Sequence, residues 1–261
     1  MNEKNHDYLK DQIKYTGFGE EAQAQLREQL MKAQNEFSIK QVISYGKDEL
    51  AVSLNFKKST NSDMYFFNSY RAELQKPGSE TSVGQTFYIN NEGRNITQKE
   101  AYNLLDGRSV NKDLANKDGQ LHNAWLKLDF KETTPNGNFK VRQFSPQYGF
   151  ELEKAVEKHP IKELTDPQER VRLLESLERG NRQVVTFAGD GDQKRFIEAN
   201  PQFKSITVYD ENQKRIRQSG ADETHKSVGQ AEKKNNQQAN KDSRGEEEKS
   251  EGNTKKRSVK V

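Results

Sequence analysis

The sequence contains no cysteine in its 261 residues. This absence excludes disulfide bonds, a thiol nucleophile and a metal site with cysteine ligands. Long apolar runs are missing as well, since hydrophobic residues make up 30% of the chain and charged residues 32%. No stretch approaches the ~18 consecutive apolar residues of a membrane-spanning helix. The N-terminus lacks the apolar core of a secretion signal. We therefore expect a cytoplasmic protein without membrane contact.

An excess of one charge sign is missing too, because 43 Lys and Arg nearly balance 40 Asp and Glu. The formal net charge is +3, of which residues 218–261 carry +2 and residues 1–217 carry +1. The last aromatic residue is Tyr209, and residues 218–261 hold few apolar side chains. Such a segment cannot bury enough surface to offset the entropy of ordering it, so we predict a disordered C-terminal tail.

Residues 1–217 alternate between helical and strand periodicity. Apolar side chains at helical spacing predict helices over 7–15, 20–35, 98–107, 150–159 and 167–179. Thr97 and Glu100 have the spacing of a capping box at the start of the third helix. Alternating apolar side chains predict strands at 37–45, 50–56, 64–75, 85–90, 124–130, 139–144, 184–187, 195–198 and 205–209.

Short turns between these strands predict antiparallel hairpins, and the helices between them indicate an α+β fold with helices packed on the sheets. Residues 64–107 and 124–159 both follow a ββα order, which suggests a degenerate repeat. We expect an N-terminal unit of helices plus a hairpin over 1–58, a second unit over 59–217 and the tail over 218–261.

The sequence offers little catalytic chemistry. It has no phosphate-binding loop and no dinucleotide-binding glycine pattern after a strand. Its 4 histidines are scattered, and none has a second histidine at the helical spacing of a metal site. We therefore predict no catalytic residue, no metal and no cofactor, and we regard an enzyme as the less favoured class.

Aromatic residues crowd the segment 64–70. Because a strand alternates its faces, Phe66 and Tyr70 are expected on the core side, and Tyr65 and Phe67 on the opposite side. Tyr65 and Phe67 then form either a second small core against the N-terminal helix or an exposed surface for a partner protein.

Basic residues cluster near the end of the folded part, close to Phe203 and Tyr209. They are Lys194, Arg195, Lys214, Arg215 and Arg217. Basic and aromatic side chains together are typical of a single-strand nucleic-acid surface. Cations that protect a solvated strand edge give the same pattern. With a charge of only +1 over residues 1–217, nucleic-acid binding is expected to be weak and sensitive to salt.

Several stretches resemble a known family. They lie at 9–20, 62–68, 99–110, 180–187 and 197–210, and the third reads Lys-Glu-Ala-Tyr-Asn-Leu-Leu-Asp-Gly-Arg-Ser-Val. They are similar to an uncharacterised family of Bacteroides and other Bacteroidetes, described as a domain of unknown function and commonly found on conjugative and other mobile elements. The resemblance implies a cytoplasmic accessory protein and no catalytic residue.

Taken together, these features predict a non-enzymatic interaction protein of a bacterial mobile element, with another protein as its partner. The alternative is a nucleic-acid-binding accessory factor that uses the basic end of the folded part and the tail.

Overall fold

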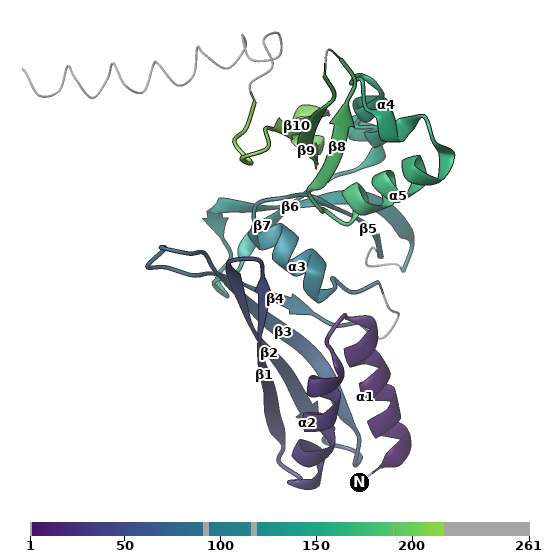
Figure 1. The fold of residues 1–261 in the computed structure, drawn as a ribbon. Coiled ribbons are helices and arrows are strands. Elements are labelled where there is room, and N and C mark those ends of the chain that lie inside the picture. The colour runs from purple at the N-terminus through teal and green to yellow at the C-terminus, as the bar shows by residue number, and fades with distance from the viewer. Residues whose placement is uncertain (1, 91–93, 116–118, 190, 217–261) are drawn as a thin grey trace, which may run out of the picture. The chain divides into compact units, whose positions relative to one another are not determined.

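The structure, a computed structural model, describes residues 2–90, 94–115, 119–189 and 191–216. These residues form five α-helices and ten strands in three antiparallel sheets, which confirms the predicted α+β class (Figure 1). The predicted disordered tail, residues 218–261, lies outside the described residues, as does Arg217. None of the described helices is long and apolar enough to cross a membrane.

The first half of the chain builds two helices and a four-stranded sheet of order β1-β2-β3-β4. A third helix follows the sheet. The elements are α1 (Glu3–Tyr15), α2 (Glu20–Met31), β1 (Glu36–Tyr45), β2 (Asp48–Lys58), β3 (Tyr65–Gln75), β4 (Val83–Tyr88) and α3 (Gln98–Leu105).

The second half builds two three-stranded sheets, of order β5-β6-β7 and β10-β9-β8. Two helices separate them along the chain. The elements are β5 (Val110–Ala115), β6 (Leu121–Thr133), β7 (Phe139–Phe144), α4 (Leu152–Glu157), α5 (Pro167–Glu178), β8 (Gln183–Phe187), β9 (Gln193–Asn200) and β10 (Ser205–Tyr209). Strand β5 was not predicted, because Val110 and Leu114 are its only large apolar residues.

Two hydrophobic cores meet at strand β6. One face of the four-stranded sheet packs with α1, α2 and α3 in the first core, and the second core lies among α4, α5 and the β8–β10 sheet. Successive residues of β6 point to opposite faces. Leu126 and Leu128 therefore belong to the first core and Trp125 to the second. This double burial is the reason that the described residues up to Ile216 form one compact unit.

The predicted boundary between residues 58 and 59 is wrong. Strands β2 and β3 lie on either side of it and pair from Glu49 with Gln75 to Lys58 with Tyr65. The two segments predicted to repeat a ββα order, 64–107 and 124–159, also pack their helices differently. Helix α3 contacts the β3–β4 hairpin that precedes it, whereas α4 contacts β10, a strand of another sheet.

Tyr65 and Phe67 are buried, at 5% and 2% exposure, so they cannot form the predicted exposed partner surface. A bulge in β3 explains the error: Asn55 pairs with Ser69 and the next residue, Phe56, pairs with Phe67, so one residue of β3 is left over. The alternation of faces therefore reverses between Phe67 and Tyr70. The rings of Tyr65, Phe67 and Tyr70 all face the first core. Phe66, expected inside, is 40% exposed.

Polar contacts hold Tyr65 in this buried position. The Asn5 side chain of α1 accepts a hydrogen bond from the Tyr65 amide (2.7 Å) and donates one to its carbonyl (2.9 Å). The Tyr65 hydroxyl donates to the Gln34 carbonyl. Every polar group of Tyr65 therefore has a partner.

Local sequence signals set the helix ends. The capping box is confirmed, since Glu100 donates its amide to the Thr97 hydroxyl (3.3 Å) and accepts from the Thr97 amide (2.8 Å). Helix α2 ends at Met31, four residues earlier than predicted, and Ala33 has the left-handed conformation (φ 51°) that terminates it.

Candidate functional site

The two edges of the four-stranded sheet differ in how their main chain is satisfied. At the β4 edge, the side-chain oxygen of Asn138 accepts a hydrogen bond from the Thr86 amide (2.9 Å), and its amide nitrogen donates to the Thr86 carbonyl (3.5 Å). Gln85 reaches from the same strand to both main-chain groups of Phe139. The turn between β6 and β7 thus satisfies the outward main chain of this edge at Thr86.

The β1 edge is open. A two-residue turn joins Tyr45 to Asp48, so these two residues exchange main-chain hydrogen bonds. In an antiparallel pair every second residue is bonded in this way, so the residues at 43, 41, 39 and 37 also bond to β2. The residues between them direct their main-chain groups away from β2. They are Glu36, Ser38, Lys40, Val42 and Ser44. No residue that the structure describes bonds to the main chain of Ser38, Lys40, Val42 or Ser44.

The open edge continues into a sheet face that no described helix covers. Its side chains stand in three rows across the strands: Ser38, Asn55, Ser69 and Tyr88; Lys40, Ser53, Arg71 and Thr86; Val42, Ala51, Glu73 and Gly84. Most are small. Three large apolar side chains protrude among them, with exposures of 67% for Val42, 66% for Tyr88 and 40% for Phe66.

Most charges on this outer face are paired. Glu36 pairs with Lys57 (2.7 Å), and Glu73 pairs with Arg71 (2.8 Å). Lys40, in the middle of the edge, forms no ion pair with any residue in the described part of the chain. A face with one unpaired cation and exposed apolar side chains suits a protein partner better than a polyanion.

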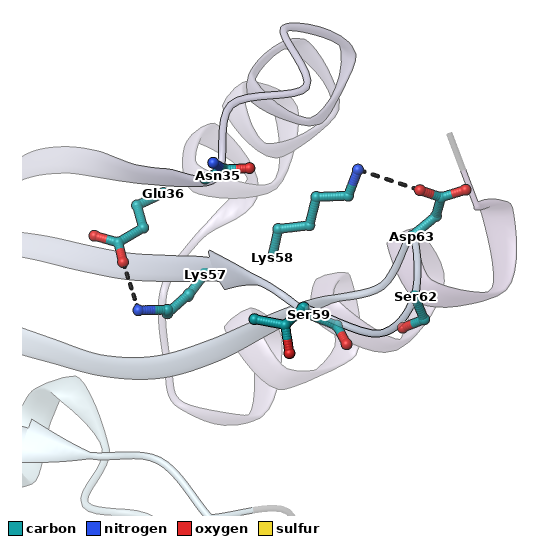
Figure 2. Close-up of a pocket in the computed structure, with 8 residues that line it drawn as sticks. Asn35, Glu36, Lys57, Lys58, Ser59, Ser62 and Asp63 are labelled. Atoms are coloured by element: carbon teal, nitrogen blue, oxygen red, sulfur yellow. Dashed lines mark ion pairs between the residues drawn. The ribbon is translucent and has the colours of Figure 1, made fainter.

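Two concave features lie at opposite parts of β1. A hollow of about 460 Å³ is lined by Val42 and Ala51 together with Lys40, Arg71 and Glu73, and Glu21 of α2 also borders it. A groove of about 680 Å³ lies where β1 begins and β2 ends; its lining includes Asn35, Glu36, Lys57, Lys58 and Asp63. Figure 2 shows its two ion pairs, Glu36 with Lys57 and Lys58 with Asp63. Each charged side chain of the groove is thus neutralised within it.

The strongest concentration of perturbed ionisable groups lies at the turn of the β1–β2 hairpin. The rings of Tyr45 and Tyr102 stack with centroids 4.0 Å apart, and the Lys99 ammonium lies over both, at 4.0 and 4.7 Å. Burial, with a smaller effect of Tyr102, raises the pKa of Tyr45 to about 12. Burial and the charge of Arg108 lower the pKa of Lys99.

Ion pairs bind the same turn to α3. Lys76 contacts both Asp48 and Asp106, Asp106 also pairs with Arg108 (3.0 Å), and the Tyr102 hydroxyl donates to Asp48 (2.9 Å). Each carboxylate therefore has cationic or hydroxyl partners. This arrangement anchors one end of β1 to the helix, and we assign it a structural role.

Four of the five predicted basic residues are described, and these four do not form one patch; Arg217 lies outside the described residues. Lys194 and Arg195 are neighbours on β9 and therefore point to opposite faces. Lys194 is exposed and donates to the Thr186 hydroxyl (2.7 Å). Lys214 is exposed beyond β10, and Arg215 pairs with Tyr209 through the main chain. Of the four that the structure describes, Lys194 and Arg215 share a face of the sheet, through the cross-strand partners Phe196 and Tyr209.

Neither a cluster of metal ligands nor a similar known protein indicates what the site does. Within the described residues, no three acidic or histidine side chains gather to hold a metal ion. Comparison of the chain with family models, curated proteins and solved structures finds no match in any of the three.

The sequence alone missed the open edge. Alternation identifies β1 as a strand and its hydrophobic face, but it does not show which neighbour lies beside it. The sequence of β1 does lack the features that usually protect an edge strand: between 36 and 45 there is no proline, and Lys40 is the only charged residue after Glu36.

Proposed function

We propose that this chain is a non-enzymatic binding protein that adds an extended segment of a partner protein to the open edge of β1. One observation carries the proposal: Asn138 pairs with the outward main chain of Thr86 on β4, whereas Ser38, Lys40, Val42 and Ser44 of β1 have outward main-chain groups that no described residue bonds. Addition of a strand satisfies such groups in register and gives affinity through main-chain hydrogen bonds.

The side chains around this edge specify the chemistry of the partner. Val42 stands beside the hollow over Ala51, so an apolar side chain of an added strand gains contact there. Lys40 has no ion pair among the described residues, so a carboxylate on the added strand would neutralise it. The segment that fits best is extended, with an apolar and an acidic side chain two positions apart.

The biological setting of this proposal comes from the sequence resemblance. The resemblance supports an accessory protein of a bacterial mobile element. The absence of cysteine and the same resemblance support a cytoplasmic location. The mostly paired charges of the outer face support a protein partner over the nucleic-acid alternative.

Capture of the partner from a Bacteroides host tests the proposal. Tagged wild-type chain, Val42→Pro and the matched control Val42→Thr are purified from nuclease-treated cells, and bound proteins are quantified by mass spectrometry. Proline removes the outward amide of residue 42, whereas threonine keeps it. We expect one or more proteins to be retained by wild type and Val42→Thr and reduced about tenfold by Val42→Pro, as the loss of ~1.4 kcal/mol predicts.

A second outward position guards against misfolding. Ser38→Pro removes another unpaired amide and should reduce the same partner, while thermal melts report whether both proline variants are folded. Equal capture by wild type and both folded proline variants would contradict the proposal. Recovery of only another copy of this chain, or loss of all partners after nuclease treatment, would also contradict it.

A further inference from the structure

The open edge of β1 has a second side, which faces helix α2. The helix packs on β1 (Figure 1), and the Gln41 side chain donates a hydrogen bond to the Glu21 carboxylate at 3.5 Å. Successive residues of a strand point to opposite faces, so Gln41 points away from the outer face that carries Lys40 and Val42. Glu21 therefore lies on the opposite side of the edge from Lys40 and Val42.

Glu21 belongs to the flank of α2 that adjoins this edge. Residues three or four positions apart share a helix flank, so Gln25, Glu28 and Lys32 continue the row that Glu21 begins. Glu28 is neutralised by Lys32 (2.8 Å), whereas Glu21 is exposed and forms no ion pair with any residue that the structure describes. Among the described residues, Glu21 is thus the charge of this flank that lacks a counter-ion.

The hollow of about 460 Å³ joins the two sides of the edge. Its charged lining consists of Lys40, Glu21 and the ion pair of Arg71 with Glu73 (2.8 Å). These charges cancel in sum, but no ion pair joins Lys40 to Glu21 within the described part of the chain. A strand added at the edge would cover both, and covering a charge without a counter-ion costs free energy. The added strand therefore has to supply a carboxylate on one side and a cation on the other.

We propose that Glu21 selects a basic side chain, lysine or arginine, at the position of the added strand between its apolar and its acidic residue. The inference rests on the proposed function, because a strand paired with β1 places alternate side chains on the two sides of the edge. The middle side chain then lies on the α2 side, next to Glu21, and its two neighbours lie beside Val42 and Lys40. In an antiparallel arrangement, which is the more stable per residue, the segment reads apolar, basic, acidic along its chain.

Two labelled peptides, with Val-Lys-Glu or Val-Glu-Glu between three threonines on each side, test the inference. Their binding to the full chain is measured by fluorescence anisotropy at low salt. We expect wild type to bind the lysine peptide about fivefold more tightly than the glutamate peptide. Glu21→Gln should reduce this preference below about twofold, and Glu21→Lys should invert it. The control Glu20→Gln removes an equal charge from the same helical turn, but Glu20 borders hollows on the α1 side, so the preference should stay at about fivefold.

Val42→Pro and its control Val42→Thr separate this inference from the proposed function. Binding that only Val42→Pro weakens, with a preference that follows residue 21, supports both. If binding depends on residue 42 in this way but the preference ignores Glu21→Gln and Glu21→Lys, the role of Glu21 is wrong and strand addition stands. Peptide binding that Val42→Pro leaves unchanged contradicts both. If wild type binds neither peptide, or if Glu20→Gln abolishes the preference as Glu21→Gln does, the pattern assigned here is wrong, whereas strand addition is still judged by capture of the natural partner.

Discussion

The two edge strands of the four-stranded sheet differ in whether their outward main-chain groups have hydrogen-bond partners. On β4, a side-chain amide imitates a neighbouring strand, because Asn138 both accepts from and donates to the main chain of Thr86. On β1, four consecutive outward positions have no such partner among the described residues. Both strands direct alternate residues to the core side, so the alternation does not distinguish them.

The difference therefore lies outside the strands themselves. Asn138 belongs to the turn between β6 and β7, which is 52 residues away from Thr86 in the chain. The second half of the protein thus supplies the partner of Thr86 at the β4 edge, and no described residue does the same for the outward main chain of β1. We therefore expect that removing an outward main-chain amide lowers the free energy of unfolding more at Thr86 of β4 than on β1.

Proline substitution at matched outward positions should give the largest effect. Thr86→Pro removes the amide that Asn138 accepts from and leaves the buried side-chain oxygen of Asn138 unpaired, so we expect a loss of about 2–4 kcal/mol in the free energy of unfolding. Val42→Pro removes an unpaired amide at an edge and should cost less than about 1 kcal/mol. Denaturant melts of both variants measure the difference. Equal losses would show that the two edges are equivalent.

Removal of the closing side chain should have a smaller effect. Asn138→Ala leaves the Thr86 amide without its acceptor at a site where Asn138 is only 9% exposed, and we expect a loss of about 1–2 kcal/mol. Ser38→Ala is the control on the other edge. It removes an exposed hydrogen bond to Asn55 and should change stability by less than about 0.5 kcal/mol. A neutral Asn138→Ala variant would mean that the β4 edge is closed by packing alone.

Much of the architecture could be predicted from the sequence because it depends on local patterns. The Thr97–Glu100 capping box and nine of the ten strands follow from residues a few positions apart. The errors arise where distant residues decide. The bulge in β3 reverses the faces of Tyr65 and Phe67, and the pairing of β2 with β3 removes the predicted boundary.

The candidate sites are harder to predict for the same reason. The predicted pair Lys194 and Arg195, which are adjacent in sequence, is separated by the alternation of β9. An edge is open when no other strand or side chain lies beside it, and the alternation of a strand's residues does not show which neighbours it has.

Ionisation of Tyr45 gives the last and smallest test, because it acts only at high pH and only at the anchored end of β1. Burial and Tyr102 raise the pKa of Tyr45 to about 12, against the opposing effect of Arg108, whereas the unfolded chain should titrate near ~10. The neutral phenol is therefore favoured in the folded protein. Its contribution to stability is complete below pH ~10 and is lost as pH rises toward about 12.

Tyr45→Phe cannot ionise at this position, so its stability should fall less steeply than that of wild type between pH ~10 and ~12. Melts across this window measure the comparison, and ultraviolet absorbance of the phenolate in both proteins assigns the missing titration to Tyr45. Other tyrosines titrate in both proteins and cancel in the difference. Parallel stability curves would show that burial against Tyr102 does not raise the pKa of Tyr45 in the folded protein.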